Sequence, residues 1–146
     1  MIDRHADALW ARLGAAEEVS GAATRLRMLV DAIGAVQEEF QAYFGAVVGC
    51  PFGNLAAEVA AADEPLRAHL HRVFVAWQLR LAEQCRLAAG EGSHVTGADP
   101  DRLARILLAQ FQGMVLLAKT DHTSAHEITT LLHDVLDRYF AEERTA

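Results

Sequence analysis

The sequence predicts an all-α domain, folded as a single helical bundle of about six helices. Apolar residues recur every three or four positions along nearly the whole chain, and no stretch alternates as a half-buried strand does. Several of the expected helices begin at a capping residue or a proline. The 146 residues, of which 52% are hydrophobic, fit one domain with a sizeable core, so we expect residues 1–146 to form one unit.

The first two expected helices are marked by apolar stripes. Residues 1–14 place Leu9 and Trp10 on one face and should end near Gly14, which weakens a helix. A second helix should begin near Ser20, a good N-cap residue, and end between Gly45 and Gly49. Its broad stripe consists of Leu26, Leu29, Val30, Ile33, Val36, Phe40 and Phe44.

A turn follows at Gly49-Cys50-Pro51-Phe52-Gly53-Asn54, because proline removes a backbone donor and the glycines permit unusual dihedral angles. Asn54 is the expected cap of a short helix over residues 55–62. Asp63 and Pro65 then open a long helix that should stop at Gly90 and Gly92. Its inward face is expected to hold Leu66, Leu70, Val73, Phe74, Trp77, Leu81 and Cys85.

The last two helices begin at strong signals. Asp99-Pro100 gives an N-cap followed by proline at the first helical position, and Ser124 with Glu127 has the spacing of a capping box. Both helices carry more apolar surface than one small bundle covers, so we expect a homodimer with a four-helix interface. The expected interface residues are Ala104, Leu108, Val115, Ile128, Leu131, Leu132, Val135, Leu136 and Tyr139.

Charge and cysteine content narrow the classes of partner. Thirteen basic against 20 acidic residues give a net charge of -7, which argues against direct contact with nucleic acid. The first ten residues are too polar for a signal peptide, and the apolar run over residues 106–118 is shorter than the roughly 20 residues that cross a bilayer. We therefore expect a cytoplasmic protein without membrane contact, whose two cysteines are reduced thiols.

This order of helices resembles the C-terminal part of the tetracycline-repressor-like (TetR family) transcription regulators. The similarity is most specific at Gly49-Cys50-Pro51-Phe52-Gly53-Asn54-Leu55, and it extends to the Asp99-Pro100 start, the Gln112-Gly113 pair and the leucine-rich last helix. In that family an N-terminal helix-turn-helix module reads the operator DNA. That module is absent from this sequence, which would open on the connecting helix of residues 1–14, so operator contact is expected only through the missing module.

The resemblance implies a pocket for a small apolar or amphipathic effector between the long central helices, and a dimer formed by the last two helices. Aromatic and flexible side chains suit an apolar ligand, and Gln110 offers an orienting amide. Taken singly, each apolar residue of this set is better explained as ordinary core packing, and the pocket interpretation gains only for the group as a whole and from the resemblance. The expected lining is Phe40, Phe44, Cys50, Phe52, Trp77, Leu81, Gln110, Phe111 and Met114.

Two other functions remain open. The domain is a purely structural dimerisation module if its pocket is closed. It is a metal-dependent helical enzyme if His122 and His126, four residues apart, hold a metal ion with His133. No pattern places a nucleophile beside a base, so we expect no catalytic residues, no metal and no cofactor.

Overall fold

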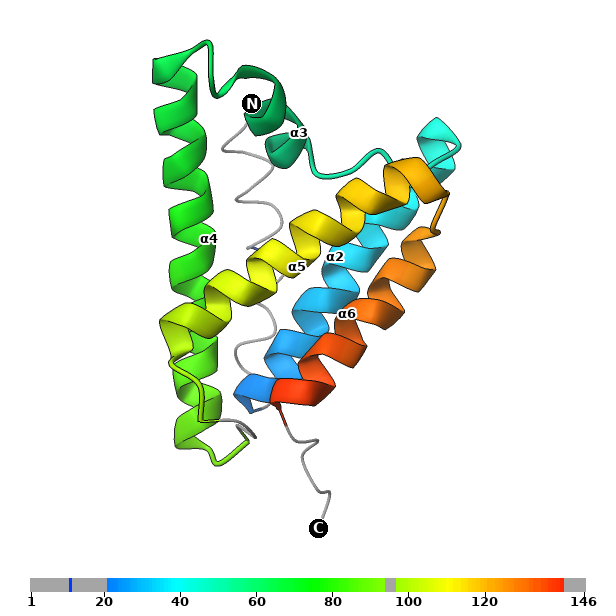
Figure 1. The fold of residues 1–146 in the computed structure, drawn as a ribbon. Helices are drawn as coiled ribbons and strands as arrows, with labels where there is room; N and C mark the ends of the chain where they lie inside the picture. Colours follow the sequence, from blue (N-terminus) through cyan, green and yellow to red (C-terminus); the bar gives the residue numbers. More distant parts are fainter. Residues whose placement is uncertain (1–10, 12–20, 94–96, 141–146) are drawn as a thin grey trace.

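The computed structural model describes Ala11 and residues 21–93 and 97–140, and the elements of this part of the chain are α-helices, as the sequence predicts (Figure 1). They are α2 (Ala22–Phe44), α3 (Pro51–Val59), α4 (Glu64–Gly90), α5 (Pro100–Asp121) and α6 (Ala125–Tyr139). The helix expected over residues 1–14 lies outside the described residues, except for Ala11. The five described helices match the later five of the six that the sequence predicts.

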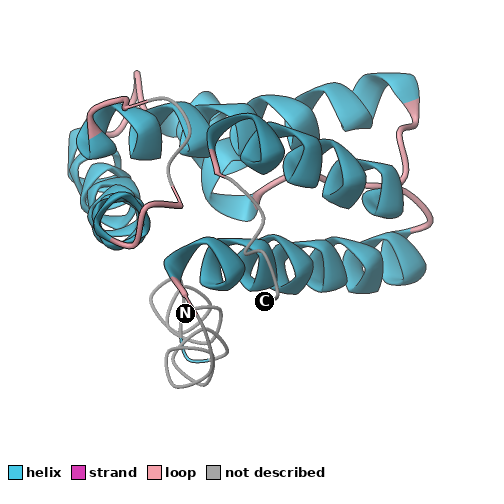
Figure 2. Cartoon of the chain, turned by 90° about the horizontal axis from the view of Figure 1, so that it is seen from below, coloured by secondary structure: helices cyan, strands magenta, loops and turns pink. Residues whose placement is uncertain are grey.

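The helices surround one shared core. α2 and α6 run antiparallel along each other, α5 packs on α4, and the short α3 lies against one end of α4 (Figures 1 and 2). α2 also contacts α4, so the four long helices enclose a common interior. The core residues are almost all aliphatic, and the largest fully buried side chains include Leu26, Leu70, Leu103, Ile128 and Phe140.

Three helix starts follow the capping signals in the sequence. The side chain of Asp63 accepts a hydrogen bond from the Leu66 amide at 2.9 Å, and Asp99 accepts one from Arg102 at 3.0 Å. Ser124 Oγ accepts one from the Glu127 amide at 3.1 Å. Each bond satisfies a backbone donor that the first helical turn leaves without a partner, so the predicted starts of α4, α5 and α6 are confirmed.

The predicted start of α3 is wrong, whereas α2 begins near the predicted position but with a different cap. α3 begins at Pro51, because proline at the first helical position needs no amide partner, and Asn54 therefore lies inside the helix instead of capping it. α2 begins at Ala22, with Gly21 as its N-cap residue, and the expected cap Ser20 lies outside the described residues. The Ala22 amide donates to the Glu91 carboxylate at 2.7 Å, so a residue beyond the end of α4 caps α2.

The seam between α2 and α6 is closely packed and polar at its edges. Gly34 faces Thr129 so closely that a Cβ at this position would overlap the Thr129 hydroxyl. Gln41 Oε1 accepts from the Ala125 amide at 2.8 Å, which adds a second cap to α6. Further along, the Arg27 guanidinium pairs with Asp137 at 2.8 Å. These contacts fix the register of the two helices.

The Gly-Cys-Pro-Phe-Gly-Asn turn holds α3 against α5. Gly49 has φ of 85°, a left-handed conformation that glycine adopts easily. Asn54 Nδ2 donates to the Val48 carbonyl at 2.8 Å, and Asn54 Oδ1 accepts from Lys119 Nζ of α5 at 3.1 Å. Gly53 lies against the amide oxygen of Gln112, where a Cβ would overlap it. Glycine at position 53 therefore permits α3 to approach α5.

We predict that Gly53→Ala destabilises the fold by about 1 kcal/mol, because the added methyl group must displace the end of the Gln112 side chain, whose amide nitrogen is buried. This sign opposes the usual effect, since alanine in place of glycine inside a helix is normally stabilising. Urea denaturation followed by circular dichroism measures the change.

Two further variants separate the overlap from other causes. Gln112→Ala in the Gly53→Ala background should restore most of the lost stability, and Gly90→Ala should cost nothing because a Cβ there meets nothing within 4 Å. A Gly53→Ala variant as stable as the wild type would contradict the close approach of α3 and α5.

Candidate functional site

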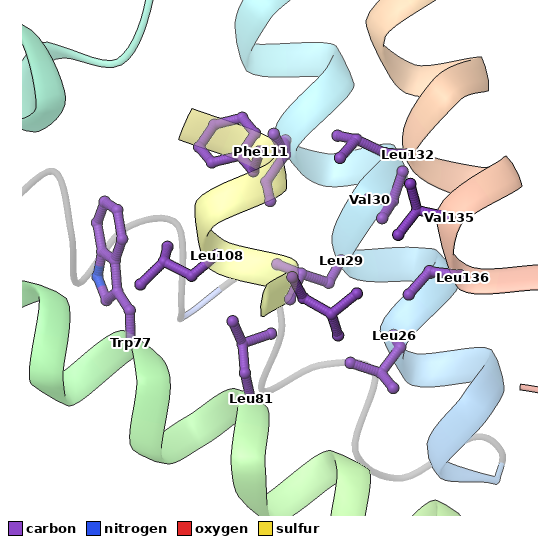
Figure 3. A pocket seen from close by; sticks show the side chains of 12 residues that line it. Leu26, Leu29, Val30, Trp77, Leu81, Leu108, Phe111, Leu132, Val135 and Leu136 are labelled. Carbon is purple, nitrogen blue, oxygen red and sulfur yellow. The ribbon is translucent and has the colours of Figure 1, made fainter. Parts of the chain in front are cut away.

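A cavity of about 70 Å³ lies inside the bundle where α2, α4, α5 and α6 meet (Figure 3). Its walls are side chains of leucine, valine, isoleucine, phenylalanine and tryptophan, so the Trp77 indole N–H is the one polar side-chain group among them. The lining residues are Leu26, Leu29, Val30, Ile33, Trp77, Leu81, Leu107, Leu108, Phe111, Leu132, Val135 and Leu136.

The hydrocarbon lining of the cavity favours apolar atoms over water. Water in a cavity needs two to four polar partners, and hydrocarbon walls supply none. An apolar molecule that enters loses its contact with water and gains dispersion contacts with the walls. The side chains that line the cavity thus suit apolar atoms and include no acid, base or nucleophile.

Trp77 links this cavity to α3. Its side chain is buried, and its ring meets Phe52 of α3 edge to face with centroids 5.0 Å apart. Phe74, one turn earlier on α4, meets the same ring at 5.7 Å. In Figure 3 the Trp77 side chain lies beside Leu108 of α5. Trp77 is therefore in contact with both the cavity and α3.

The residues that the sequence predicts for the ligand site fall into separate groups. Trp77, Leu81 and Phe111 line the cavity, and Phe52 touches it only through Trp77. The others do not line it. Phe44 is 58% exposed and packs with Phe40 at the end of α2. Gln110 and Met114 are half-buried on α5. Cys50 lines a separate groove.

The residues expected at a dimer interface require a correction, because most of them are covered by the chain itself. The side chains of Ala104, Val115 and Ile128 are at most 1% exposed. Leu108, Leu132, Val135 and Leu136 line the internal cavity. Of the nine, Leu131 is 40% exposed and Tyr139 is partly buried. α5 and α6 turn their most continuous apolar faces inward, toward α2 and α4, which leaves other residues on their outer faces.

Sequence reasoning missed the contribution of α2 to this cavity. Leu26, Leu29, Val30 and Ile33 belong to the predicted apolar stripe of this helix, but nothing in the pattern separates the wall of a cavity from filled core. Leu107 was missed for the same reason. The one usable signal was the high density of leucine and valine on four different helices.

A second, more open groove of about 340 Å³ lies between α3 and α5. It is bordered by Cys50, Gly53, Asn54, Ala57, Glu58, Phe74, Gln112, Gly113, Val115, Leu116 and Lys119. Its principal cation, Lys119, already donates to Asn54, and Gln112 lies against Gly53. The polar groups of this groove thus take part in holding the α3 turn.

The described residues give no support to a metal site. They contain no group of three or more histidine, cysteine or acidic side chains positioned to hold an ion. His122 is the left-handed C-cap of α5, whereas His133 pairs with Asp31 of α2 at 2.7 Å. Burial raises the pKa of the Cys85 thiol to about 12, which keeps it protonated and unreactive. No helix in the described part of the chain is long and apolar enough to cross a membrane.

The family comparison matches residues 22–131 to the tetracyclin repressor-like C-terminal domain. The transcriptional regulator AcuR of Cereibacter sphaeroides is 37% identical over 84 residues, 58% of this chain and 38% of the relative. The HTH-type transcriptional repressor DhaR of a Mycobacterium species is 32% identical over 88 residues, 56% of this chain and 44% of the relative. The chain thus aligns with less than half the length of these curated relatives.

The fold agrees with this comparison. The crystal structure of the regulatory protein TetR from Rhodobacter sphaeroides superposes with a TM-score of 0.74 and 28% identity, covering 94% of this chain and 71% of that one. The matched family region includes the whole of α2 to α5 and the first half of α6, and therefore most of the cavity wall. The chain belongs to the tetracycline-repressor-like transcription regulators, of which it contains the C-terminal domain.

Proposed function

We propose that this chain is an effector-binding and dimerisation domain, which holds a small apolar molecule in the cavity between α2, α4, α5 and α6. The observation that carries the proposal is the hydrocarbon wall, built by side chains from four helices. A void of this kind forfeits dispersion contacts when it is empty, so filling it with a matching molecule stabilises the folded domain.

Effector binding would act on the regulator through helix positions. A ligand shifts a conformational equilibrium only by its difference in affinity between the two states. The cavity of this domain is small, so a bound molecule larger than it would push Trp77 outward against Phe52 and move α3. In the full regulator this movement would lower affinity for operator DNA, which the acidic domain itself does not contact.

Dimerisation would use the outer face of α5. Ile106, Gly113 and Leu117 lie within about 40° of one another around the helix axis. Ile106 is 40% exposed, Leu117 is 62% exposed, and a Cβ at Gly113 would meet nothing within 4 Å, so this face presents two apolar side chains beside an uncovered glycine. With the exposed Leu131 of α6 it forms a surface that a second copy can cover.

One observation favours the structural alternative, in which the domain dimerises without sensing a ligand. The cavity holds about 70 Å³, less than half of the roughly 150 Å³ of an engineered cavity that binds benzene. A domain of this alternative kind binds no small molecule at its centre. Ligand binding to the cavity therefore distinguishes the two functions.

We predict that xenon, a probe that dry hydrocarbon cavities bind, enters the cavity of the wild-type chain. Methyl signals of lining residues such as Leu132 and Val135 should shift in NMR spectra under xenon pressure. Leu108→Trp should abolish these shifts by filling the space.

The matched control is Leu79→Trp, an equally large change at an exposed position of α4, which should leave the xenon shifts intact. Circular dichroism verifies that both variants fold. Wild-type methyl groups that do not respond to xenon would remove the support for the sensor function and leave the structural alternative.

We predict that Leu117→Arg converts a dimer into monomers, because the arginine places an unpaired charge in the covered face. Sedimentation equilibrium should show a dimer dissociation constant at least about tenfold higher than that of the wild type.

Leu79→Arg on α4 is the control, since Leu79 is almost as exposed as Leu117 but lies on another helix. It should leave the dissociation constant unchanged. A wild-type chain that is monomeric at every concentration, or a dimer broken by Leu79→Arg instead, would contradict the α5 interface.

A further inference from the structure

Among the described residues, Gln37 of α2 is the one polar residue that is buried, with 3% of its surface exposed. Its amide oxygen Oε1 has no hydrogen-bond partner within the structure. A buried acceptor without a donor is unfavourable, because the group gave up its bonds to water on folding. An apolar residue of similar shape would avoid this cost. The stability of the fold therefore does not explain why an amide stands at position 37.

The position of Gln37 connects it with the cavity. At 100° per residue its direction from the α2 axis falls between those of Leu26 and Val30, within about 20° of each. Both of these residues line the cavity, and so does Ile33, one helical turn before Gln37. Gln37 thus continues the cavity-lining face of α2 by about 6 Å along the axis.

Two contacts between α2 and α6 show where Gln37 lies along the length of this helix pair. Gly34 faces Thr129, and Gln41 accepts a hydrogen bond from the Ala125 amide. Since the helices are antiparallel, Gln37 lies at the level between these two contacts, next to Ile128 and one turn from Leu132. Leu132 and Phe111 stand at the same end of the cavity in Figure 3. Gln37 is not itself a lining residue, and it lies one helical turn beyond Ile33, just past this end of the cavity.

The neighbouring glutamine shows what a structural amide does at this seam. Gln41, one turn later on α2, uses its Oε1 to cap α6 at 2.8 Å. Gln37 Oε1 caps nothing and bridges no helices within the described residues. Helix packing thus accounts for Gln41 and not for Gln37.

We propose that Gln37 is the polar recognition residue of the cavity, and that the effector is a small uncharged molecule with an apolar body and one hydrogen-bond donor, such as a hydroxyl group. This inference rests on the proposed effector-binding function. The donor would bond to Gln37 Oε1 while the body fills the hydrocarbon walls. A charged effector is excluded, because the walls offer no group to pair with its charge.

The test uses three probes that each have five heavy atoms, namely 1-butanol, diethyl ether and pentane. The alcohol donates a hydrogen bond, the ether only accepts one, and pentane does neither. Their dissociation constants for the wild-type chain and for Gln37→Leu are obtained from NMR shifts of the cavity methyl groups. Gln78→Leu, a half-buried glutamine on α4 outside the cavity lining, is the matched control.

We expect Gln37→Leu to weaken 1-butanol binding about fivefold to tenfold and to leave the ether and pentane affinities within about twofold. Gln78→Leu should change none of the three. The ligand-free Gln37→Leu variant should also unfold at a higher urea concentration, because the unpaired oxygen is gone. Gln37→Met, which is unbranched, serves the same purpose if the leucine variant does not fold.

The outcomes that contradict the role of Gln37 differ from those that contradict the effector site itself. An unchanged alcohol affinity in Gln37→Leu, with all probes still in the cavity, overturns the role of Gln37 and leaves the effector site standing. A selective loss of ether binding overturns it too, since the amide nitrogen would then be the contact. If none of the probes moves the cavity methyl groups in any variant, the effector site itself fails.

Discussion

The close contact between α2 and α6 determines where the other helices can lie. Because Gly34 has no side chain, the Thr129 hydroxyl can rest on the α2 backbone, and two turns further along α2 the Gln41 amide caps α6. This pair then presents one joint apolar wall to α4 and α5. The wall is complete along most of its length but leaves the small cavity at its centre, since Leu, Val and Ile side chains from four directions do not fill the space fully.

α5 is the element that the cavity and the proposed interface share. Leu107, Leu108 and Phe111 face the cavity, while Ile106 and Leu117 point away from it. A helix of this kind cannot shift on one side without moving the other, because packed side chains behave as rigid neighbours. The ring contact between Trp77 and Phe52 extends the same arrangement to α3. Occupancy of the cavity and the geometry of the dimer would thus be coupled through one rigid helix.

Local signals in the sequence were sufficient for much of the fold and for little of the site. Asp63, Asp99 and Ser124 cap their own helices, so a short window of sequence contains everything that determines these starts. The cap of α2 comes from Glu91, which is 69 positions from Ala22, and no local pattern indicates it. Leu132 and Val135 have the spacing of an interface or a core equally well, and only the packing of four helices makes them walls of a cavity. For the same reason Gln37 was not distinguished from the other polar residues of α2.

The cavity also determines how the domain responds to compression. Internal voids disappear when a chain unfolds, so the unfolded state occupies a smaller total volume and hydrostatic pressure favours it. The hydrocarbon-lined space at the junction of four helices is the part of this domain where such a volume change would be concentrated. A molecule that fills the space removes this volume difference without adding a single covalent bond. A domain that held the proposed effector would accordingly be less compressible, with smaller volume fluctuations at its centre.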